Sequence, residues 1–230
     1  MNGFSWKRAL TESAVVVASI LLAFAIDAWW QEREDRDLEV LAIAGIRSDF
    51  ESHIAEIDTS LVRNRTRAAA ADSLLQIVGP EAVAEDPAAI LRHMGHGAFL
   101  STVTFQGGSL ATLTNTAGLA SLRNPGLRLA LSDWLQALEF NEVLNVWAYD
   151  ETAKYSEELE DRVPLVDLDR AVGIDEVPAS RFQVDVTPVL RSVSFANRVY
   201  QQRFVSTAVI AHMTRMREIA ERVPELSVLE

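Results

Sequence analysis

An uninterrupted apolar block at residues 14–26 constrains the fold of this chain more than any other feature. Two basic residues precede the block and two tryptophans follow it, namely Lys7, Arg8, Trp29 and Trp30. This arrangement is typical of a membrane-spanning helix with interfacial anchors at its ends. The block alone would rise only about 20 Å as a helix, less than a hydrocarbon core of about 30 Å. We therefore predict a span over residues 9–30, which includes flanking polar residues and rises about 33 Å.

The same stretch also fits a secretory signal peptide with cleavage after Ala25, because small residues surround that position. Against cleavage, the helical pattern continues through Asp27 and the tryptophan pair into a charged run at residues 31–36 that contains no turn former. This continuity favours a retained anchor.

Basic residues near the ends of the span set its expected orientation. The terminal amine, Lys7 and Arg8 lie on one side, and Arg33 and Arg36 lie on the other. The positive-inside rule therefore favours a cytoplasmic N-terminus and a C-terminal domain outside the cytoplasm. In a bacterium that places the anchor in the inner membrane and the domain in the periplasm.

One face of the predicted span carries both of its acids and a pair of small residues. At 100° per residue, this face lies within about 80° and holds Glu12, Val16, Ser19, Ala23 and Asp27. Small residues four apart let two helices approach closely, so the face is a candidate helix–helix interface within the membrane. The alternative is that both acids lie near enough to the interfaces to reach water, with the small residues merely tolerated.

The composition of the 230 residues favours helices and excludes several functional classes. Ten glycines and seven prolines are too few for a turn-dense β-sandwich. A net charge of −12 repels phosphate backbones, which argues against nucleic acid as a partner. The absence of cysteine removes disulfides, zinc–cysteine sites and thiol catalysis.

Beyond the anchor, which we assign to residues 1–34, residues 35–230 predict a helical domain. Long helices are expected over residues 38–78, from Asn124-Pro125 onward, and over residues 195–223, each with an apolar stripe that recurs every three or four positions. Shorter helices are expected from Asp86-Pro87, with an interruption at residues 95–97, and between residues 108 and 116. Residues 164–188 predict an irregular acidic connection, with a short extended piece at residues 182–186.

Three long helices with matching stripes predict an all-α, elongated antiparallel bundle, coiled-coil-like in its seams, that continues out of the anchor. Four amides fall on the stripes, namely Asn64, Asn141, Asn145 and Gln202. Buried amides commonly specify helix register, which is the interpretation we favour, and the alternative is a polar ligand pocket inside the bundle.

Two segments resemble those of an uncharacterised family of bacterial single-pass membrane proteins. In that family a glutamate leads the apolar span and Asn or Asp, followed by x-Trp, closes it, as residues 12–29 do here. Residues 104–113 and 118–124 resemble its second signature. Ala117 replaces the usual serine, and Leu110-Ala111 replace an aromatic–acid pair. The resemblance covers the chain to about Tyr155 and implies a membrane anchor with a helical domain, but it implies no activity.

No pattern of catalytic or metal-binding residues is complete, so we predict no enzyme, no cofactor and no metal site. His93 and His96 are spaced for one helical face but lack a third ligand nearby. His53 lacks the glutamate three residues earlier that a di-iron motif requires, and we expect it to be solvated and salt-bridged. No phosphate-binding loop or nucleophile elbow is present.

Charge is unevenly distributed near the C-terminus. Residues 150–188 hold eleven acids, whereas residues 189–217 hold five arginines and no acid. These segments either pair with each other or form a docking surface for a basic partner. The sequence thus predicts a non-enzymatic inner-membrane protein that contacts the lipid bilayer and acts as a scaffold or accessory subunit, bound to a membrane protein or to a second copy. The alternative is a periplasmic bundle that binds a small ligand or a metal.

Overall fold

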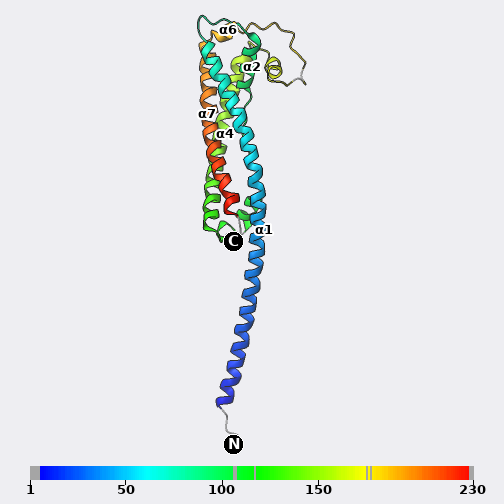
Figure 1. Cartoon of the computed structure of the whole chain (residues 1–230), viewed down its shortest axis with the longest axis vertical. Helices are drawn as coiled ribbons and strands as arrows, with labels where there is room; N and C mark the ends of the chain where they lie inside the picture. Colours follow the sequence, from blue (N-terminus) through cyan, green and yellow to red (C-terminus); the bar gives the residue numbers. More distant parts are fainter. Residues whose placement is uncertain (1–5, 106–107, 117, 175, 177, 228–230) are drawn as a thin grey trace.

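The computed structural model describes residues 6–105, 108–116, 118–174, 176 and 178–227, with side chains from residue 15 onward. The described residues form helices and no strand, which confirms the all-α prediction. The molecule is a slender bundle with one helix projecting far beyond its lower end (Figure 1).

The projecting element is helix α1, Trp6–Ile77, which runs for 72 residues without a break. Its N-terminal half stands alone, and its C-terminal half packs into the bundle (Figure 1). Among the residues with described side chains, Ile43 is the first of α1 to be buried. The helix ends at Ile77, one residue before the predicted end, and Gly79-Pro80 follows shortly after it. Anchor and bundle are therefore joined by continuous helix.

Helix α2, Pro87–Ala98, begins where predicted, because the Asp86 carboxylate accepts a hydrogen bond from the Ala89 amide at 3.0 Å. The predicted interruption at residues 95–97 is wrong. Gly95 and Gly97 lie inside the helix and are buried. A Cβ at Gly95 would lie 2.6 Å from the backbone oxygen of Leu168, so the glycine permits close packing instead of ending the helix.

Two long helices complete the frame. Helix α4, Pro125–Glu160, is capped by the Asn124 side chain, which accepts from two backbone amides at 2.9 and 3.1 Å. Helix α7, Val193–Leu226, is capped by Ser192, whose hydroxyl accepts from the Phe195 amide. Helix α7 packs against both α1 and α4 and runs antiparallel to them (Figure 1).

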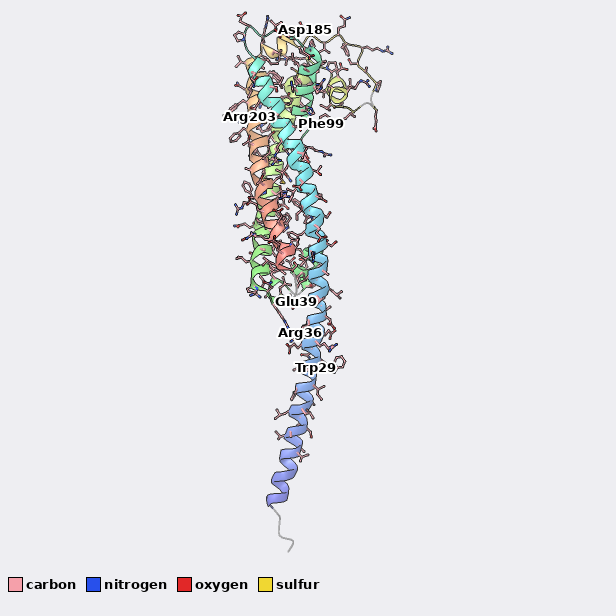
Figure 2. The ribbon with its side chains drawn as sticks, in the orientation of Figure 1. Trp29, Arg36, Glu39, Phe99, Asp185 and Arg203 are labelled. Atoms are coloured by element: carbon pink, nitrogen blue, oxygen red, sulfur yellow. The ribbon has the colours of Figure 1, made fainter. Side chains whose placement is uncertain are left out.

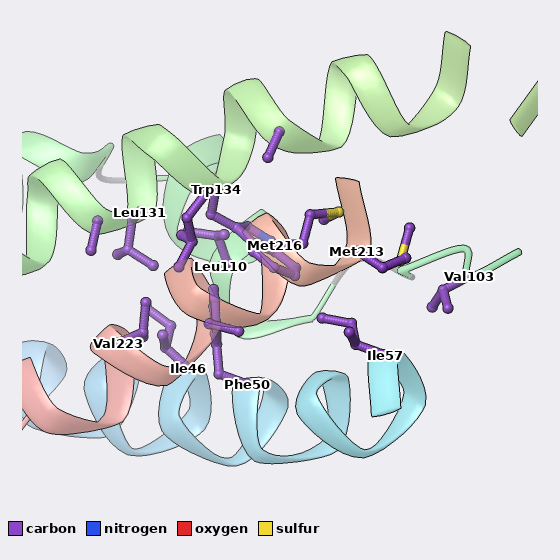
Figure 3. Close-up of a cluster of buried hydrophobic side chains, with 14 of the residues drawn as sticks. Ile46, Phe50, Ile57, Val103, Leu110, Leu131, Trp134, Met213, Met216 and Val223 are labelled. Atoms are coloured by element: carbon purple, nitrogen blue, oxygen red, sulfur yellow. The ribbon is translucent and has the colours of Figure 1, made fainter. Parts of the chain in front are cut away.

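The remaining side of the bundle is closed by a descending segment, which the sequence did not predict. After α2, residues 99–105 run as non-helical chain toward helix α3, Ser109–Thr116, and the 3-10 helix η1, Leu119–Ser121. Val103 of the descending segment and Leu110 of α3 join the core around Trp134 (Figure 3), and α3 confirms the short helix predicted between residues 108 and 116. The three long helices therefore bury their seams partly against this segment and not only against each other.

The acidic connection at residues 164–188 contains more structure than predicted. Helix α5, Leu165–Ala171, and the single turn α6, Thr187–Leu190, interrupt it. Residues 182–186 form no strand, since no neighbouring chain pairs with their backbone. Helix α5 packs on α2 through Leu168, which the absent side chain of Gly95 allows.

Candidate functional site

The predicted membrane face lies on a fully exposed part of α1. Val16, Ser19, Ala23 and Asp27 lie on one side of the helix, and no part of the described chain covers them. The Ser19 hydroxyl donates to the Val15 carbonyl at 2.8 Å, so its hydrogen-bonding capacity is used within the helix. The side chains of Lys7, Arg8 and Glu12 fall outside the described residues.

The two tryptophans form a compact aromatic pair at the end of the span. The Trp29 and Trp30 rings meet edge to face, with centroids 5.7 Å apart. The guanidinium of Arg33 lies 5.9 Å from the Trp29 centroid, within range of a cation–π contact. Amphipathic rings next to a cation suit the interfacial position that the sequence predicts.

A charged stalk at residues 31–42 separates the tryptophans from the bundle. Twelve helical residues rise about 18 Å. Figure 2 shows Trp29 and Arg36 on the projecting helix and Glu39 at the lower edge of the bundle. The stalk is braced there, because the Arg123 amide donates to the Glu39 carboxylate at 2.6 Å and the Arg123 guanidinium lies 3.6 Å from Glu32.

A groove of about 990 Å³ opens between the stalk and α3. Its apolar lining comes from both helices and includes Leu38, Leu41, Ala42 and Leu113. Leu38 and Leu41 are 59% and 69% exposed, which is high for leucines outside the predicted span. Asp35, Glu39 and Arg123 also line the groove, so it combines an apolar wall with charged residues.

Asn64 holds the descending segment against α1. Its side-chain amide donates to the Ser101 carbonyl at 2.6 Å, and the Ser60 hydroxyl donates to the same oxygen at 3.0 Å. Non-helical backbone inside a core needs such partners, because an unpaired buried carbonyl costs about 1–3 kcal/mol.

Two side-chain amides of α4 hold the descending segment from the opposite side. Asn141 and Asn145 both donate to the Val103 carbonyl, at 2.9 and 3.2 Å. Gln202 donates to the Glu151 carbonyl at 2.8 Å and so joins α7 to α4. The three asparagines thus bind the descending segment, whereas Gln202 alone joins two long helices as a register residue would.

Arg67 is a buried residue that the sequence analysis missed. It is 1% exposed, and its Nε donates to the Gly97 carbonyl at 3.1 Å. Its Nη2 donates to the Thr152 hydroxyl at 2.7 Å. Burial lowers the pKa of Arg67 to about 10. The neighbouring Tyr155 hydroxyl is fully buried, which raises its pKa. The role of Arg67 is structural, because it provides a hydrogen-bond donor for the Gly97 carbonyl at the C-terminal end of α2.

His53 lies in an aromatic cluster, so the prediction of a solvated, salt-bridged histidine is wrong. Its ring stacks on Trp134 with centroids 5.6 Å apart and lies 5.0 Å from the Phe105 ring. The descending segment brings Phe105 to this position, which the local sequence around His53 does not reveal.

His93 and His96 lie on α2 as predicted. Among the residues that the structure describes, no three histidine or acidic side chains come close enough to hold a metal ion. Burial, followed by the nearby charges of His93 and Arg92, lowers the pKa of His96.

The stability of the fold is expected to depend on pH through two other histidines, His53 and His212. Burial lowers the pKa of His53, against the opposing charges of Glu56 and Asp49, and burial likewise lowers the pKa of His212. The same histidines in the unfolded chain have a pKa of about 6.5. At pH values just below 6.5 the unfolded chain therefore binds protons while both rings stay neutral in the folded protein. Their contribution to stability is therefore complete above that value and is lost as the pH falls through their lower folded-state pKa values.

We expect the melting temperature of the full chain in detergent to fall between pH 7.5 and pH 5. It should fall less in a His53→Phe, His212→Phe double variant, as followed by circular dichroism. Carboxylates contribute equally to both proteins, so the difference between them reports the histidines. An identical pH dependence of the two proteins would contradict the prediction.

Comparison of the chain with protein-family models, with curated proteins and with solved structures gives no match. The resemblance at residues 12–29 and 104–124 therefore stays a prediction.

Proposed function

We propose that this chain is a non-enzymatic, single-pass inner-membrane protein whose periplasmic bundle acts as a scaffold or accessory subunit through protein contacts. The observation that carries the proposal is the unbroken α1, which leads from an exposed apolar segment directly into the bundle core. The helix is long and apolar enough to cross a membrane. A signal peptide needs no such continuity with the domain that follows it.

The stalk supports a role in positioning. Its length sets the bundle about 18 Å beyond the tryptophan pair. The contacts of Arg123 with Glu32 and Glu39 join the stalk to the base of the bundle. A braced helix holds a domain at a fixed height and angle, which suits a protein that presents surfaces to neighbours in the same membrane.

The surface of the bundle supports action through protein contacts. Several large apolar side chains on α4 point to solvent, including Phe140, Val143 and Val146, which are 56%, 67% and 70% exposed. Apolar side chains that gather on one exposed face commonly mark interaction sites. The proposal that the protein is non-enzymatic rests on the absence of complete catalytic motifs in the sequence.

Topology is tested by fusing reporters after Glu230. We expect a periplasm-active reporter to be active and a cytoplasm-dependent reporter to be silent. We also expect the mass of the intact protein, extracted from membranes, to include residues 1–25. The opposite reporter result would overturn the orientation, and a mass that begins at Ile26 would overturn the anchor.

A further inference from the structure

Helices α4 and α7 together expose an apolar surface on the side away from the core, which we call the α4–α7 face. Its residues are Phe140, Val143 and Trp147 of α4 and Tyr200, Phe204, Ala208 and Ala211 of α7. Phe204 and Tyr200 are 53% and 57% exposed, and the Trp147 and Phe204 rings meet edge to face at 5.9 Å. Exposed aromatic residues clustered on two adjacent helices are typical of a protein interface.

The position of this face along the bundle excludes the bilayer as its occupant. Salt bridges from α7 fix its height, because Arg217 pairs with Asp58 at 2.6 Å and Arg203 pairs with Asp72. The face lies between these two arginines except for Tyr200, which is one turn beyond Arg203 and thus farther from the anchor. Asp58 is far beyond Trp30 on the same straight helix, by a rise of about 40 Å. Lipid at the level of the tryptophans therefore does not reach the face.

Unpaired charges of both signs border the face, and one of them is Glu218, which is exposed on α7 beyond Ala211. Four of the five arginines in residues 189–217 have a partner: Arg191 donates to the Ala82 carbonyl, and Arg198, Arg203 and Arg217 form ion pairs with acids. The fifth, Arg215, is exposed beside the α7 part of the face, and Glu139 is exposed beside the α4 part. Neither forms an ion pair with another of the described residues. An acid on one helix and a base on the other form a self-complementary pattern.

Membrane anchoring restricts how two copies can meet. If both copies have the same orientation in one membrane, as the proposed function requires, the twofold axis that relates them must run along the membrane normal, and thus along the bundle. Rotation about that axis places α4 of one copy opposite α7 of the other at the same height. Contacts between α4 and α7 within one copy show which of their residues lie at the same height along the bundle. Phe140 is level with His212, and Trp147 is level with Phe204.

We infer that the α4–α7 face joins two copies of this chain into a parallel homodimer. In this arrangement Glu139 lies opposite the partner's Arg215, and the reverse pair forms across the axis. The large side chains Phe140 and Val143 lie opposite the partner's Ala211 and Ala208, whose small size leaves room for them. The α1 helices pack on the other side of α7, through Asp58 and Asp72, so the spans are held apart and the dimer does not need the membrane face at Ser19 and Ala23.

Charge reversal tests the pairing in the full chain. We expect the wild type to sediment as a dimer in detergent. Glu139→Arg and Arg215→Glu should each raise the dissociation constant of the dimer about tenfold, because like charges then face each other twice. The double reversal should restore the wild-type value. Glu142→Arg is the matched control and should change nothing, since Glu142 is also exposed on α4 but points away from α7.

A monomeric wild type, or a double reversal no tighter than the single reversals, would overturn the inference. Cysteine crosslinking then tests the geometry in intact membranes. The chain has no cysteine of its own, so only the introduced cysteines can react. We expect tagged Val143→Cys and Ala208→Cys chains, expressed together, to crosslink with a short thiol reagent. Glu142→Cys with Ala208→Cys should not crosslink. Absence of the first crosslink would overturn the proposed face while leaving the topology, measured by the reporters, unaffected.

Discussion

Replacing Trp134 with alanine is expected to lower the free energy of unfolding by about 3–5 kcal/mol, the largest stability effect of any single substitution we consider. One cluster of buried apolar side chains, which we call the lower core, is formed by α1, α4, α7 and the descending segment. Trp134 is 1% exposed at its centre (Figure 3). Its ring lies 4.8 Å from Phe50 and 5.0 Å from Phe105, which come from α1 and from the descending segment. Truncation leaves a cavity that three separate elements would have to move together to fill.

The measurement is denaturant unfolding of the full chain in detergent, followed by circular dichroism. Trp29→Ala is the matched control, because Trp29 is 55% exposed on the projecting helix and touches no core residue. It should leave the unfolding midpoint of the bundle unchanged. A loss of less than about 1 kcal/mol for Trp134→Ala would mean that the lower core collapses around the cavity, contrary to a well-packed interior.

Helix ends were predictable because their signals are local. Asp86-Pro87 and Asn124-Pro125 both place a capping side chain directly before a proline, and both caps form as expected. The stripe on α7 was also predictable. Every residue assigned to it is buried, from Val199 to Val223, because α7 lies between α1 and α4 and presents one broad face to both.

The stripe on α4 was harder to assign, since two different neighbours pack against that helix. Leu138 and Asn145 fall on the apolar stripe of this helix, yet they are half-buried, whereas Ala137 and Leu144, one position earlier, are buried. On one side α4 meets α7, and on another it meets the descending segment. A single helical period describes one contact line and therefore misassigns residues where the helix has two.

The descending segment explains most of what the sequence analysis missed. Residues 99–105 carry no helical or strand pattern, and nothing nearby in sequence shows that they enter the core. The partners of Asn64 and the aromatic surroundings of His53 both result from its path. The burial of Arg67 results from the packing of α2 and α4 against α1. Asparagines on the helical stripes indicated that the stripes do not pack only against other helices, but they did not identify residues 99–105 as the neighbouring segment.

Gly97 offers a sharp test of this packing, because glycines at residues 95–97 were mistaken for a helix break. We expect Gly97→Val to lower the free energy of unfolding by about 3 kcal/mol. An added Cβ would lie 2.7 Å from the Tyr155 hydroxyl and 2.8 Å from the nearest atom of its ring. Tyr155 is fully buried, and its hydroxyl donates to the Met94 carbonyl, so the ring has no space to move. The Gly97 carbonyl also accepts from Arg67, which couples any shift of α2 to the buried guanidinium.

If Gly97 were helical but not closely packed, Gly97→Val would stabilise the chain by a few tenths of a kcal/mol through higher helix propensity. The predicted signs are therefore opposite, and chemical denaturation of the full chain in detergent distinguishes them. Gly79→Val is the matched control, since a Cβ there would have no atom within 4 Å and its φ is not in the left-handed region. We expect the control to change stability little, and a stabilised Gly97→Val protein would show that α2 does not pack closely on Tyr155.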